Sequence, residues 1–339
     1  MGPLQIKQIL STSPDGQAVT LKGWVRTKRE SKNAIFIALN DGSTIHNIQA
    51  VAEPGQFSAE LIQLVTTGSC LKIEGNLVAS LGAGQSVEVK IVDLQVYGTA
   101  DPDLYPLQPK KHSLEFLREI AHLRPRTNTF GAILRVRHAL AFAVHQYFND
   151  KGFFYLHTPV ITASDAEGAG EMFRVTTLDL EKLPRNEEGG INFKEDFFGR
   201  EANLTVSGQL EGELGAMALS KIYTFGPTFR AENSNTTRHL AEFWMIEPEM
   251  AFFELQDNMD LAEDFVKTVI QYVLVNCKDD LDFLQKRLAE EDKSKPQNER
   301  SIPLLEKLSF VVDNPFERIT YTEAIEILLK SKPQKEKKF

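Results

Sequence analysis

The sequence predicts an α+β protein in which a small closed β-barrel is followed by a larger region that mixes strands and helices. Two observations lead to this prediction. The first 100 residues contain five short alternating or β-branched runs, with turn signals at Asp41-Gly42 and Gly82-Ala83-Gly84. Farther along, apolar residues recur at spacings of three and four, which is typical of an amphipathic helix. A closed barrel is favoured over an open sheet because closure leaves no unpaired edge.

Composition excludes several classes of protein. The chain has 339 residues, enough for two or three domains, and its 42% hydrophobic and 25% charged residues are ordinary for a globular protein. No apolar run approaches the roughly 18 residues that span a membrane, and the first residues lack the order of a secretory signal. Cys70 and Cys277 form neither a disulfide framework nor a metal-ligand spacing. We therefore expect a cytoplasmic protein without a membrane partner.

The charge distribution limits the kind of nucleic-acid binding that is possible. A net charge of −9 argues against a protein that coats nucleic acid nonspecifically. The predicted barrel nevertheless carries a basic cluster, Arg26, Lys28, Arg29 and Lys32. Small barrels can present a face to single-stranded nucleic acid, so the cluster is either part of such a face or a solvated strand end.

Three regions are expected along the chain. The barrel occupies residues 1–100, a proline-containing linker residues 101–129, and a second domain residues 130–339. Residues 253–318 begin with an amphipathic pattern and are expected to form a helical insertion in the second domain.

The second domain is expected to open with a helix and a strand. The helix should begin near Phe130 and end at Gly152, a residue that suits the left-handed turn after a helix. The following stretch FFYLHTPVITAS predicts a strand. Pro159 within it indicates a sheet edge or an interface, because proline cannot donate a ladder hydrogen bond.

The stretch FRAENSNTTRHLAEF, residues 229–243, predicts a hairpin with a polar loop. Alternation places Arg230 and Glu232 on one face of its first strand, and Phe243 lies on the second strand. A guanidinium matches phosphate oxygens, and an aromatic ring stacks on a base. These parts together indicate a site for a nucleoside triphosphate. The pattern GxxxxGK[ST] does not occur, which excludes a P-loop.

This hairpin resembles motif 2 of the class II aminoacyl-tRNA synthetases, and RAENSNTTRHLAEF is especially similar to the asparaginyl-tRNA synthetases of the aspartyl-like subgroup. The resemblance extends in order over essentially the whole chain. It implies ATP as a substrate, accompanied by Mg²⁺. It also implies Arg230 at the ATP α-phosphate, Glu232 near the adenine amino group and Phe243 stacked on adenine, while Arg238 and His239 approach the outer phosphates.

Other segments resemble further parts of the same family. FNDKGFFYLHTPVI resembles motif 1, which implies a homodimer interface that includes Pro159. In SDAEGAGEMF, the resemblance implies that Glu167 binds the ammonium group of the substrate. LTVSGQLEGELGAM places Ser207 and Gln209 where an apolar strand meets the start of a helix, a junction that exposes N–H donors. The resemblance implies that both residues hold the amino acid.

The resemblance also bears on which amino acid is selected. Aspartyl enzymes carry a lysine facing the substrate carboxylate, whereas this chain reads SGQLEGE in that region. A carboxylate repels aspartate but accepts a hydrogen bond from an amide NH₂. Asparagine is therefore implied, with Glu213 as the selecting residue and Glu211 as its alternative. An aspartyl-tRNA synthetase stays open as an alternative.

The barrel segments GWVRTKRE, AIFIALNDGS and NIQAV resemble the OB-fold anticodon-binding domain of this subgroup. The resemblance implies that Phe36 stacks on the central anticodon base and Gln49 reads it, with tRNA(Asn) as the partner. A buried core position is the alternative for Phe36. The basic cluster, including Arg26 and Lys28, would contact backbone phosphates.

The resemblance stops before motif 3, the glycine-rich segment that completes the ATP site, because no glycine follows Gly226. The family's acidic metal-binding residue lies in the same missing part, so the metal ligands are unknown. We expect an OB-fold barrel followed by an incomplete class II antiparallel-sheet domain, an amino-terminal fragment that is poorly active alone. Two further alternatives are an asparagine synthetase paralogue, which would lack the barrel, and a non-catalytic tRNA-binding protein.

Overall fold

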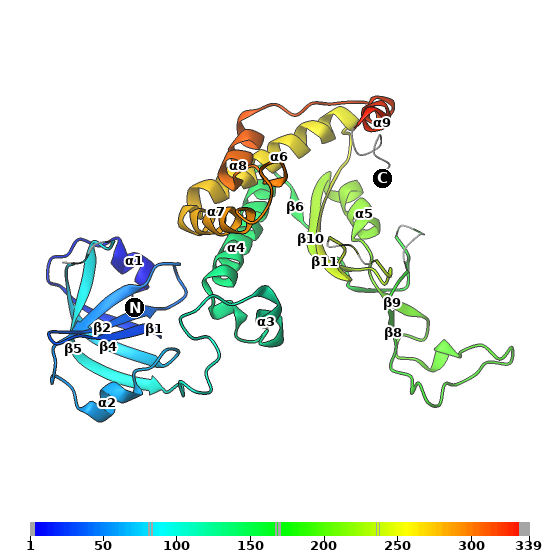
Figure 1. Ribbon diagram of the computed structural model, residues 1–339. Helices are drawn as coiled ribbons and strands as arrows, with labels where there is room; N and C mark the ends of the chain where they lie inside the picture. The colour runs from blue at the N-terminus through cyan, green and yellow to red at the C-terminus, as the bar shows by residue number, and fades with distance from the viewer. Residues whose placement is uncertain are drawn as a thin grey trace. The chain divides into compact units, whose positions relative to one another are not determined.

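The computed structural model describes residues 4–80, 82, 84–166, 168, 171–234, 236 and 238–331. The chain divides into two compact units (Figure 1). Unit 1 comprises Met1–His138 with Leu274–Lys307, and unit 2 comprises Ala139–Val273 with Leu308–Phe339. Each unit has a hydrophobic core of its own.

Unit 1 contains the closed five-stranded barrel that the sequence predicts. The strand order is β1-β2-β3-β5-β4, with antiparallel pairs except for the parallel pair of β3 and β5. The strands are β1 (Ala18–Glu30), β2 (Ile35–Asn40), β3 (Ile48–Ala52), β4 (Cys70–Ala79) and β5 (Val87–Gly98). Two short helices, α1 (Ile6–Leu10) and α2 (Ala59–Leu64), accompany it.

Alternation along the strands builds the barrel core. Leu21, Ile37 and Ile73 point inward and are fully buried, whereas the residues between them are more exposed. Gly75 is required by close packing, because a Cβ there would lie 2.2 Å from the carbonyl oxygen of Lys90. Period-two burial of aliphatic side chains therefore accounts for this fold.

The segment predicted as a linker is partly helical. It contains α3 (Leu114–Glu119) and the 3₁₀ helix η1 (Arg124–Arg126), and it belongs to unit 1. Ser113 caps α3 by accepting a hydrogen bond from the Phe116 N–H at 3.2 Å. Leu117 anchors the helix because it is 2% exposed.

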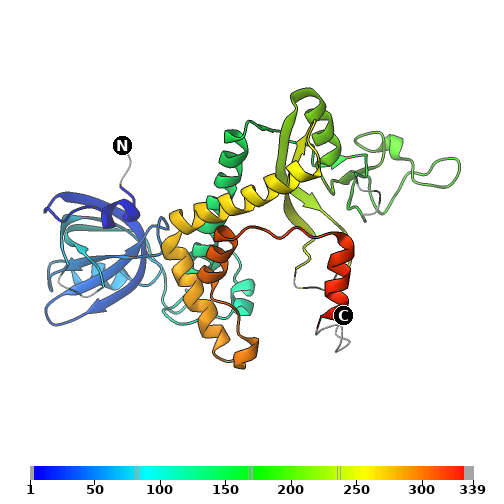
Figure 2. The same ribbon diagram turned by 90° about the horizontal axis from the view of Figure 1, so that it is seen from above.

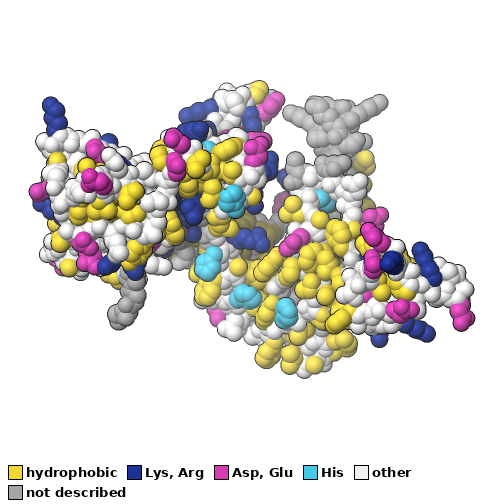
Figure 3. Space-filling view, turned by 90° about the horizontal axis from the view of Figure 1, so that it is seen from below, with side chains coloured by type: hydrophobic (Ala, Val, Ile, Leu, Met, Phe, Trp, Pro, Cys, Tyr) yellow, Lys and Arg dark blue, Asp and Glu magenta, His cyan; other side chains and the backbone are white. Residues whose placement is uncertain are grey.

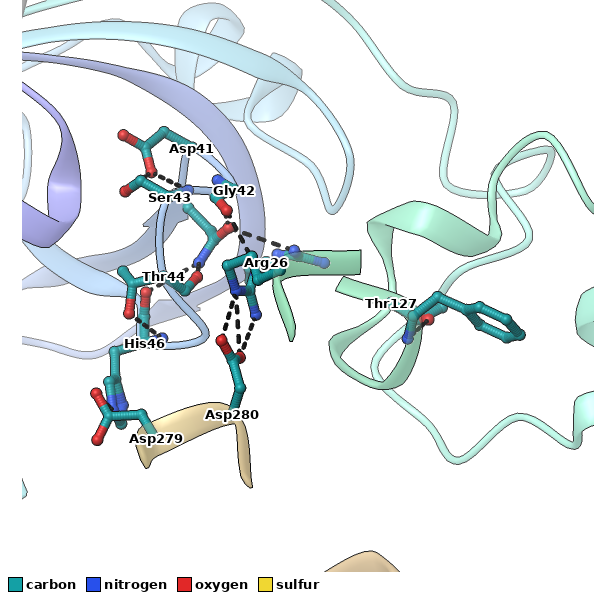
Figure 4. Close-up of polar contacts among 12 residues, drawn as sticks. Arg26, Asp41, Gly42, Ser43, Thr44, His46, Thr127, Asp279 and Asp280 are labelled. Atoms are coloured by element: carbon teal, nitrogen blue, oxygen red, sulfur yellow. Dashed lines mark hydrogen bonds and ion pairs between the residues drawn. The ribbon is translucent and has the colours of Figure 1, made fainter. Parts of the chain in front are cut away.

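A polar cluster ties three parts of unit 1 together (Figure 4). The Arg135 guanidinium donates to both carboxylate oxygens of Asp280, at 2.7 to 3.2 Å, and to the Gly42 carbonyl at 3.0 Å. These residues come from α4 (Asn128–Asp150), α7 (Lys278–Asp292) and the loop after β2. The bidentate geometry fixes that loop to both helices.

The predicted long helix is α4, which begins at Asn128, two residues before the expected Phe130. Gly152 follows it with a φ of +76°, as the C-terminal glycine pattern predicts. In unit 2, Val144 and Phe148 of this helix pack with Phe265 and Val269 of α6 (Leu255–Asn276). The amphipathic pattern of α6 is confirmed, and that of α4 holds for Leu140, Val144 and Phe148, whereas Ile133 near its start is exposed.

The sequence predicts one continuous strand around Pro159, and this prediction is wrong. Two strands stand in its place, β6 (Phe154–Tyr155) and β7 (Ile161–Thr162), and Pro159 lies exposed between them. The missing N–H of proline explains the interruption. β6 joins a sheet of order β11-β10-β6, and β7 joins one of order β7-β9-β8.

The remaining strands of unit 2 are β8 (Arg174–Val175), β9 (Ala202–Leu204), β10 (Lys221–Phe229) and β11 (Glu242–Met250). α5 (Gln209–Leu219) packs against the β10–β11 hairpin (Figures 1 and 2). The hairpin is present as predicted, but β10 ends at Phe229. Arg230 and Glu232 therefore follow the strand and do not share one of its faces.

The last described helices are α8 (Leu304–Asp313) and α9 (Tyr321–Lys330), preceded by the 3₁₀ helix η3 (Gln297–Glu299). The segment 253–318 is largely helical in the structure. Within the residues that the structure describes, no helix is both long and apolar enough to cross a membrane.

Candidate functional site

The junction between β9 and α5 positions Ser207 and Gln209. Both residues lie where the sequence predicts them, with Ser207 buried and Gln209 at the first position of the helix. Gly208 between them must be glycine, because a Cβ would lie 2.7 Å from Thr158 Oγ1. The Gln209 N–H donates to Ser207 Oγ at 3.0 Å, so the hydroxyl orders the start of the helix.

Glu247 on β11 organises this junction. Its Oε1 accepts from Ser207 Oγ at 2.5 Å, and its Oε2 accepts from Thr224 Oγ1 at 2.7 Å and from the Gly208 N–H at 3.2 Å. Sequence reasoning did not assign Glu247 to the site. Glu247 lies four residues after Phe243 on β11, so strand alternation places both on one face, and this pattern could have identified Glu247.

Further carboxylates surround the junction. Gln209 Nε2 donates to Glu213 Oε1 at 3.0 Å, one helical turn along α5. Burial raises the pKa of the Glu249 carboxyl, and the nearby Glu213 and Glu247 raise it further. The structure thus brings Glu213 to Gln209. A site rich in acceptors suits a ligand that carries N–H donors, such as an ammonium or an amide group.

The hairpin places Arg230 over Phe243. The guanidinium carbon lies 5.4 Å from the ring centroid, a cation–π distance. The Arg230 N–H donates to the Ala241 carbonyl at 3.0 Å, which extends the ladder by one bond beyond β10. Pairing of the two strands therefore explains how a cation and a ring far apart in sequence come together.

The hairpin connection holds the other predicted nucleotide contacts. Glu232 is exposed, and the Ala231 N–H beside it donates to the Glu171 carbonyl at 2.7 Å. Arg238 and His239 are also exposed, and His239 Nδ1 lies against Thr236 Oγ1. Glu167, predicted to bind an ammonium group, lies outside the described residues.

A second candidate site is a hollow of about 970 Å³ on the barrel, lined by Phe36, Gln49 and Arg29 among others. The Arg29 guanidinium carbon lies 5.3 Å from the Phe36 ring centroid. Gln49 Nε2 donates to Glu88 Oε2 at 3.4 Å. Ile35 and Ile37 face the core while Phe36 faces outward, so the core alternative for Phe36 is excluded.

Two of the predicted anticodon cations lie elsewhere. Arg26 stands at a β-bulge between Val25 and Thr27, and its guanidinium contacts the Arg126 carbonyl and Asn40 Oδ1. Lys28 Nζ donates to the Ile62 carbonyl at 2.8 Å. Neither residue lines the hollow. Arg29 is the cation that faces Phe36.

Within the described part of the chain, no group of three or more histidine, cysteine, aspartate or glutamate side chains is arranged to hold a metal ion.

Comparisons with known proteins agree with this geometry. The family model for tRNA synthetases class II (D, K and N) matches residues 113–339, and the model for the OB-fold nucleic acid binding domain matches residues 19–97. The asparagine–tRNA ligase of Cytophaga hutchinsonii is 61% identical over all of this chain and 71% of its own length. That of Porphyromonas gingivalis is 60% identical over 92% of this chain and 64% of its own length.

Solved structures give the same result. The asparaginyl-tRNA synthetase of Pyrococcus horikoshii, complexed with asparaginyl-adenylate, matches with a TM-score of 0.76 and 26% identity over 97% of this chain and 67% of that one. The Entamoeba histolytica enzyme in complex with asparaginyl-adenylate matches with a TM-score of 0.71 and 25% identity, over 95% and 65% of the two chains. The chain thus spans about two thirds of these relatives, and it belongs to the class II tRNA synthetases of the D, K and N group.

Proposed function

We propose that this chain serves in an asparagine–tRNA ligase, which activates asparagine with ATP and transfers it to tRNA(Asn). The observation that carries the proposal is the junction of Ser207, Gln209, Glu213 and Glu247, an acceptor-rich pocket edge built on the same β10–β11 hairpin that pairs Arg230 with Phe243. The relatives named above support it, since their names state asparagine and asparaginyl-adenylate.

Activation joins the asparagine carboxylate to the ATP α-phosphorus. The carboxylate oxygen attacks in line, the bond from the α-phosphorus to the bridging oxygen breaks, and pyrophosphate leaves with Mg²⁺, which enters as part of the ATP substrate. Arg230 stabilises the charge on the α-phosphate and Phe243 stacks on adenine, with Glu232 at the adenine amino group and Arg238 and His239 at the outer phosphates. Catalysis of this kind depends on positioning and electrostatics.

Selection of asparagine is assigned to the carboxylate of Glu213. Its contact with Gln209, a predicted amino-acid ligand, favours it over Glu211. Glu213 is exposed in the structure, and its carboxylate would accept a hydrogen bond from the asparagine amide and repel the carboxylate of aspartate. Glu167 remains the proposed partner of the substrate ammonium group.

Glu247→Gln should raise the KM for asparagine by about tenfold, with a smaller change in kcat. The reason is that three donors share the two Glu247 oxygens, whereas glutamine offers one oxygen and sets its NH₂ against a donor. Asparagine-dependent ATP–pyrophosphate exchange measures the effect. Glu242→Gln, an exposed position on the same strand, serves as the control, and equal KM values in the two variants would contradict the assignment.

The barrel hollow is proposed as the anticodon site. Phe36 offers a ring to stack on the central base, Gln49 offers an amide to read it, and Arg29 supplies a cation beside both. In this proposal, residues 1–100 form the anticodon-binding domain, 101–129 the connection and 130–339 the catalytic domain, with 253–318 as an insertion.

Phe36→Ala should weaken tRNA(Asn) binding by about 1–3 kcal/mol, the contribution of one stacked base. Filter binding at fixed salt measures the loss. Tyr97→Ala is the matched control, because Tyr97 is a half-exposed barrel ring that does not line the hollow. If both variants bind tRNA equally well, the hollow is not the anticodon site.

We also propose a cytoplasmic homodimer whose interface includes Pro159. Large apolar side chains of unit 2 are exposed near it in sequence and in the neighbouring sheet, namely Phe142, Phe154, Tyr155, Trp244 and Ile246. Figure 3 shows that apolar side chains also gather on the face of the molecule seen there. Burial of such a surface would favour association.

The proposed function is tested by charging purified tRNA(Asn) with labelled asparagine, using the protein as its source organism makes it. Formation of asparaginyl-tRNA that depends on ATP is the expected result. Binding of tRNA without any ATP-dependent charging would favour the non-catalytic tRNA-binding alternative.

A further inference from the structure

A separate hollow of about 600 Å³ lies in unit 1, away from the proposed anticodon hollow. Its described lining comes mainly from β1, from the 105–129 segment and from α7, and Asn47, Thr67 and Gly68 add to it. The two hollows share no described lining residue. Trp24 lines this hollow and Arg29 lines the proposed anticodon hollow. The two residues are five positions apart on β1, which corresponds to roughly 16 Å along an extended strand.

Cations dominate the described lining of this hollow. They are Arg26, Lys110, Lys111, Arg126, Lys286 and Arg287, whereas the acidic lining residue is Glu290. Glu290 already lies 3.6 Å from Lys111, and Arg287 pairs with Glu291 at 3.0 Å. Among the described residues, the ammonium groups of Lys110 and Lys286 have no ion-pair partner. The excess of positive charge is unusual in a chain whose net charge is −9.

Arg26 is a partly buried member of this set. Its Nε atom is buried with no hydrogen-bond partner among the described residues, and its guanidinium meets a carbonyl and an amide oxygen but no carboxylate. Burial lowers the pKa of Arg26, the nearby Tyr105 opposes this by raising it, and the cations Arg135 and Arg126 lower it further. A partly desolvated cation among like charges is stabilised when an anion compensates it.

An aromatic ring completes the hollow. Trp24 is 43% exposed, and the Arg126 guanidinium carbon lies 5.9 Å from its ring centroid. Guanidinium and ammonium groups suit phosphate oxygens, and an exposed indole suits stacking against a base or sugar. The ring therefore distinguishes this hollow from a general basic patch.

We propose that this hollow binds the phosphate group of a nucleotide, with Trp24 beside it and with Arg26, Lys110, Arg126 and Lys286 as its oxyanion partners (Figure 4 shows the surroundings of Arg26). The phosphate belongs either to a free nucleotide or to an RNA backbone. A free nucleotide would make the site independent of the proposed function, whereas an RNA backbone would make it part of the tRNA-binding surface that the proposed function requires.

Trp24 fluorescence tests the proposal. In a Trp244→Phe background, Trp24 is the remaining tryptophan of the chain. Inorganic phosphate, AMP and a short RNA hairpin are titrated separately against the full protein. Saturable quenching by phosphate and AMP would identify a free phosphate ligand, and quenching by the RNA hairpin alone would identify a backbone phosphate. Either result supports the site.

Removal of two lysine charges from the hollow provides a second test of the proposal. Lys110→Ala combined with Lys286→Ala should weaken binding at least about tenfold. For RNA, the slope of log K against log salt concentration should fall by the equivalent of about two phosphate contacts. Lys278→Ala combined with Lys293→Ala is the matched control, since it removes two charges from α7 and its C-terminal cap outside the hollow. No quenching by any of the three probes, or equal affinity in the two double variants, would overturn the proposal.

Discussion

Asp280→Ala should destabilise the protein by about 3 kcal/mol, measured as the free energy of unfolding in urea. The Asp280 side chain is 10% exposed and accepts three hydrogen-bond contacts from Arg135. Its removal leaves a partly buried guanidinium without a counter-ion. The charge of Arg135 also acts on Arg26 and lowers its pKa. Removal of Asp280 therefore leaves both cations without its compensating negative charge.

Asp282→Ala on the same helix provides the control. Asp282 pairs with Lys278, whose side chain is 74% exposed, and exposed pairs contribute about 0.5 kcal/mol. A loss in Asp280→Ala no larger than in Asp282→Ala would show that the cluster at Gly42, Arg135 and Asp280 does not hold the barrel loop to α4 and α7.

Arg230→Ala should lower kcat for asparagine-dependent ATP–pyrophosphate exchange by about 100- to 1,000-fold. In the proposed function, its guanidinium stabilises charge that develops at the α-phosphate, so its loss affects the transition state more than asparagine binding. The KM for asparagine should change little, because Ser207, Gln209 and Glu247 remain in place.

Arg185→Ala is the matched control for Arg230, since Arg185 is exposed and donates to the Gly189 carbonyl in a loop of the same unit. It should leave exchange unchanged. If Arg230→Ala kept the kcat of the parent protein while only the KM for ATP rose, Arg230 would be a binding residue without a role in the chemical step.

The barrel and the hairpin could be predicted from the sequence because local patterns determine them. Alternating aliphatic residues identify the inward faces of β1 to β5, and the same alternation places Phe36 outward. The polar loop between two strands predicts the β10–β11 hairpin. In these elements, neighbours along the chain carry the information.

The misses arise from contacts between distant residues. Glu247 gains its role from Ser207 and Thr224, which lie 40 and 23 positions away, and strand alternation places it on the Phe243 face without revealing these partners. Arg26 leaves the predicted basic face because of a bulge in the pairing of β1 with β2. Pro159 interrupts a strand whose two halves join different sheets. In each of these cases, contacts between residues far apart in the sequence determine the local structure.

Amino-acid competition in ATP–pyrophosphate exchange tests the central proposal most directly. The protein is purified from its source organism and supplied with ATP and either asparagine or aspartate. The proposal predicts that asparagine supports exchange and that aspartate, even in excess, neither supports nor strongly inhibits it, because Glu213 repels its carboxylate. Exchange driven by aspartate at a rate equal to or above that with asparagine would contradict it.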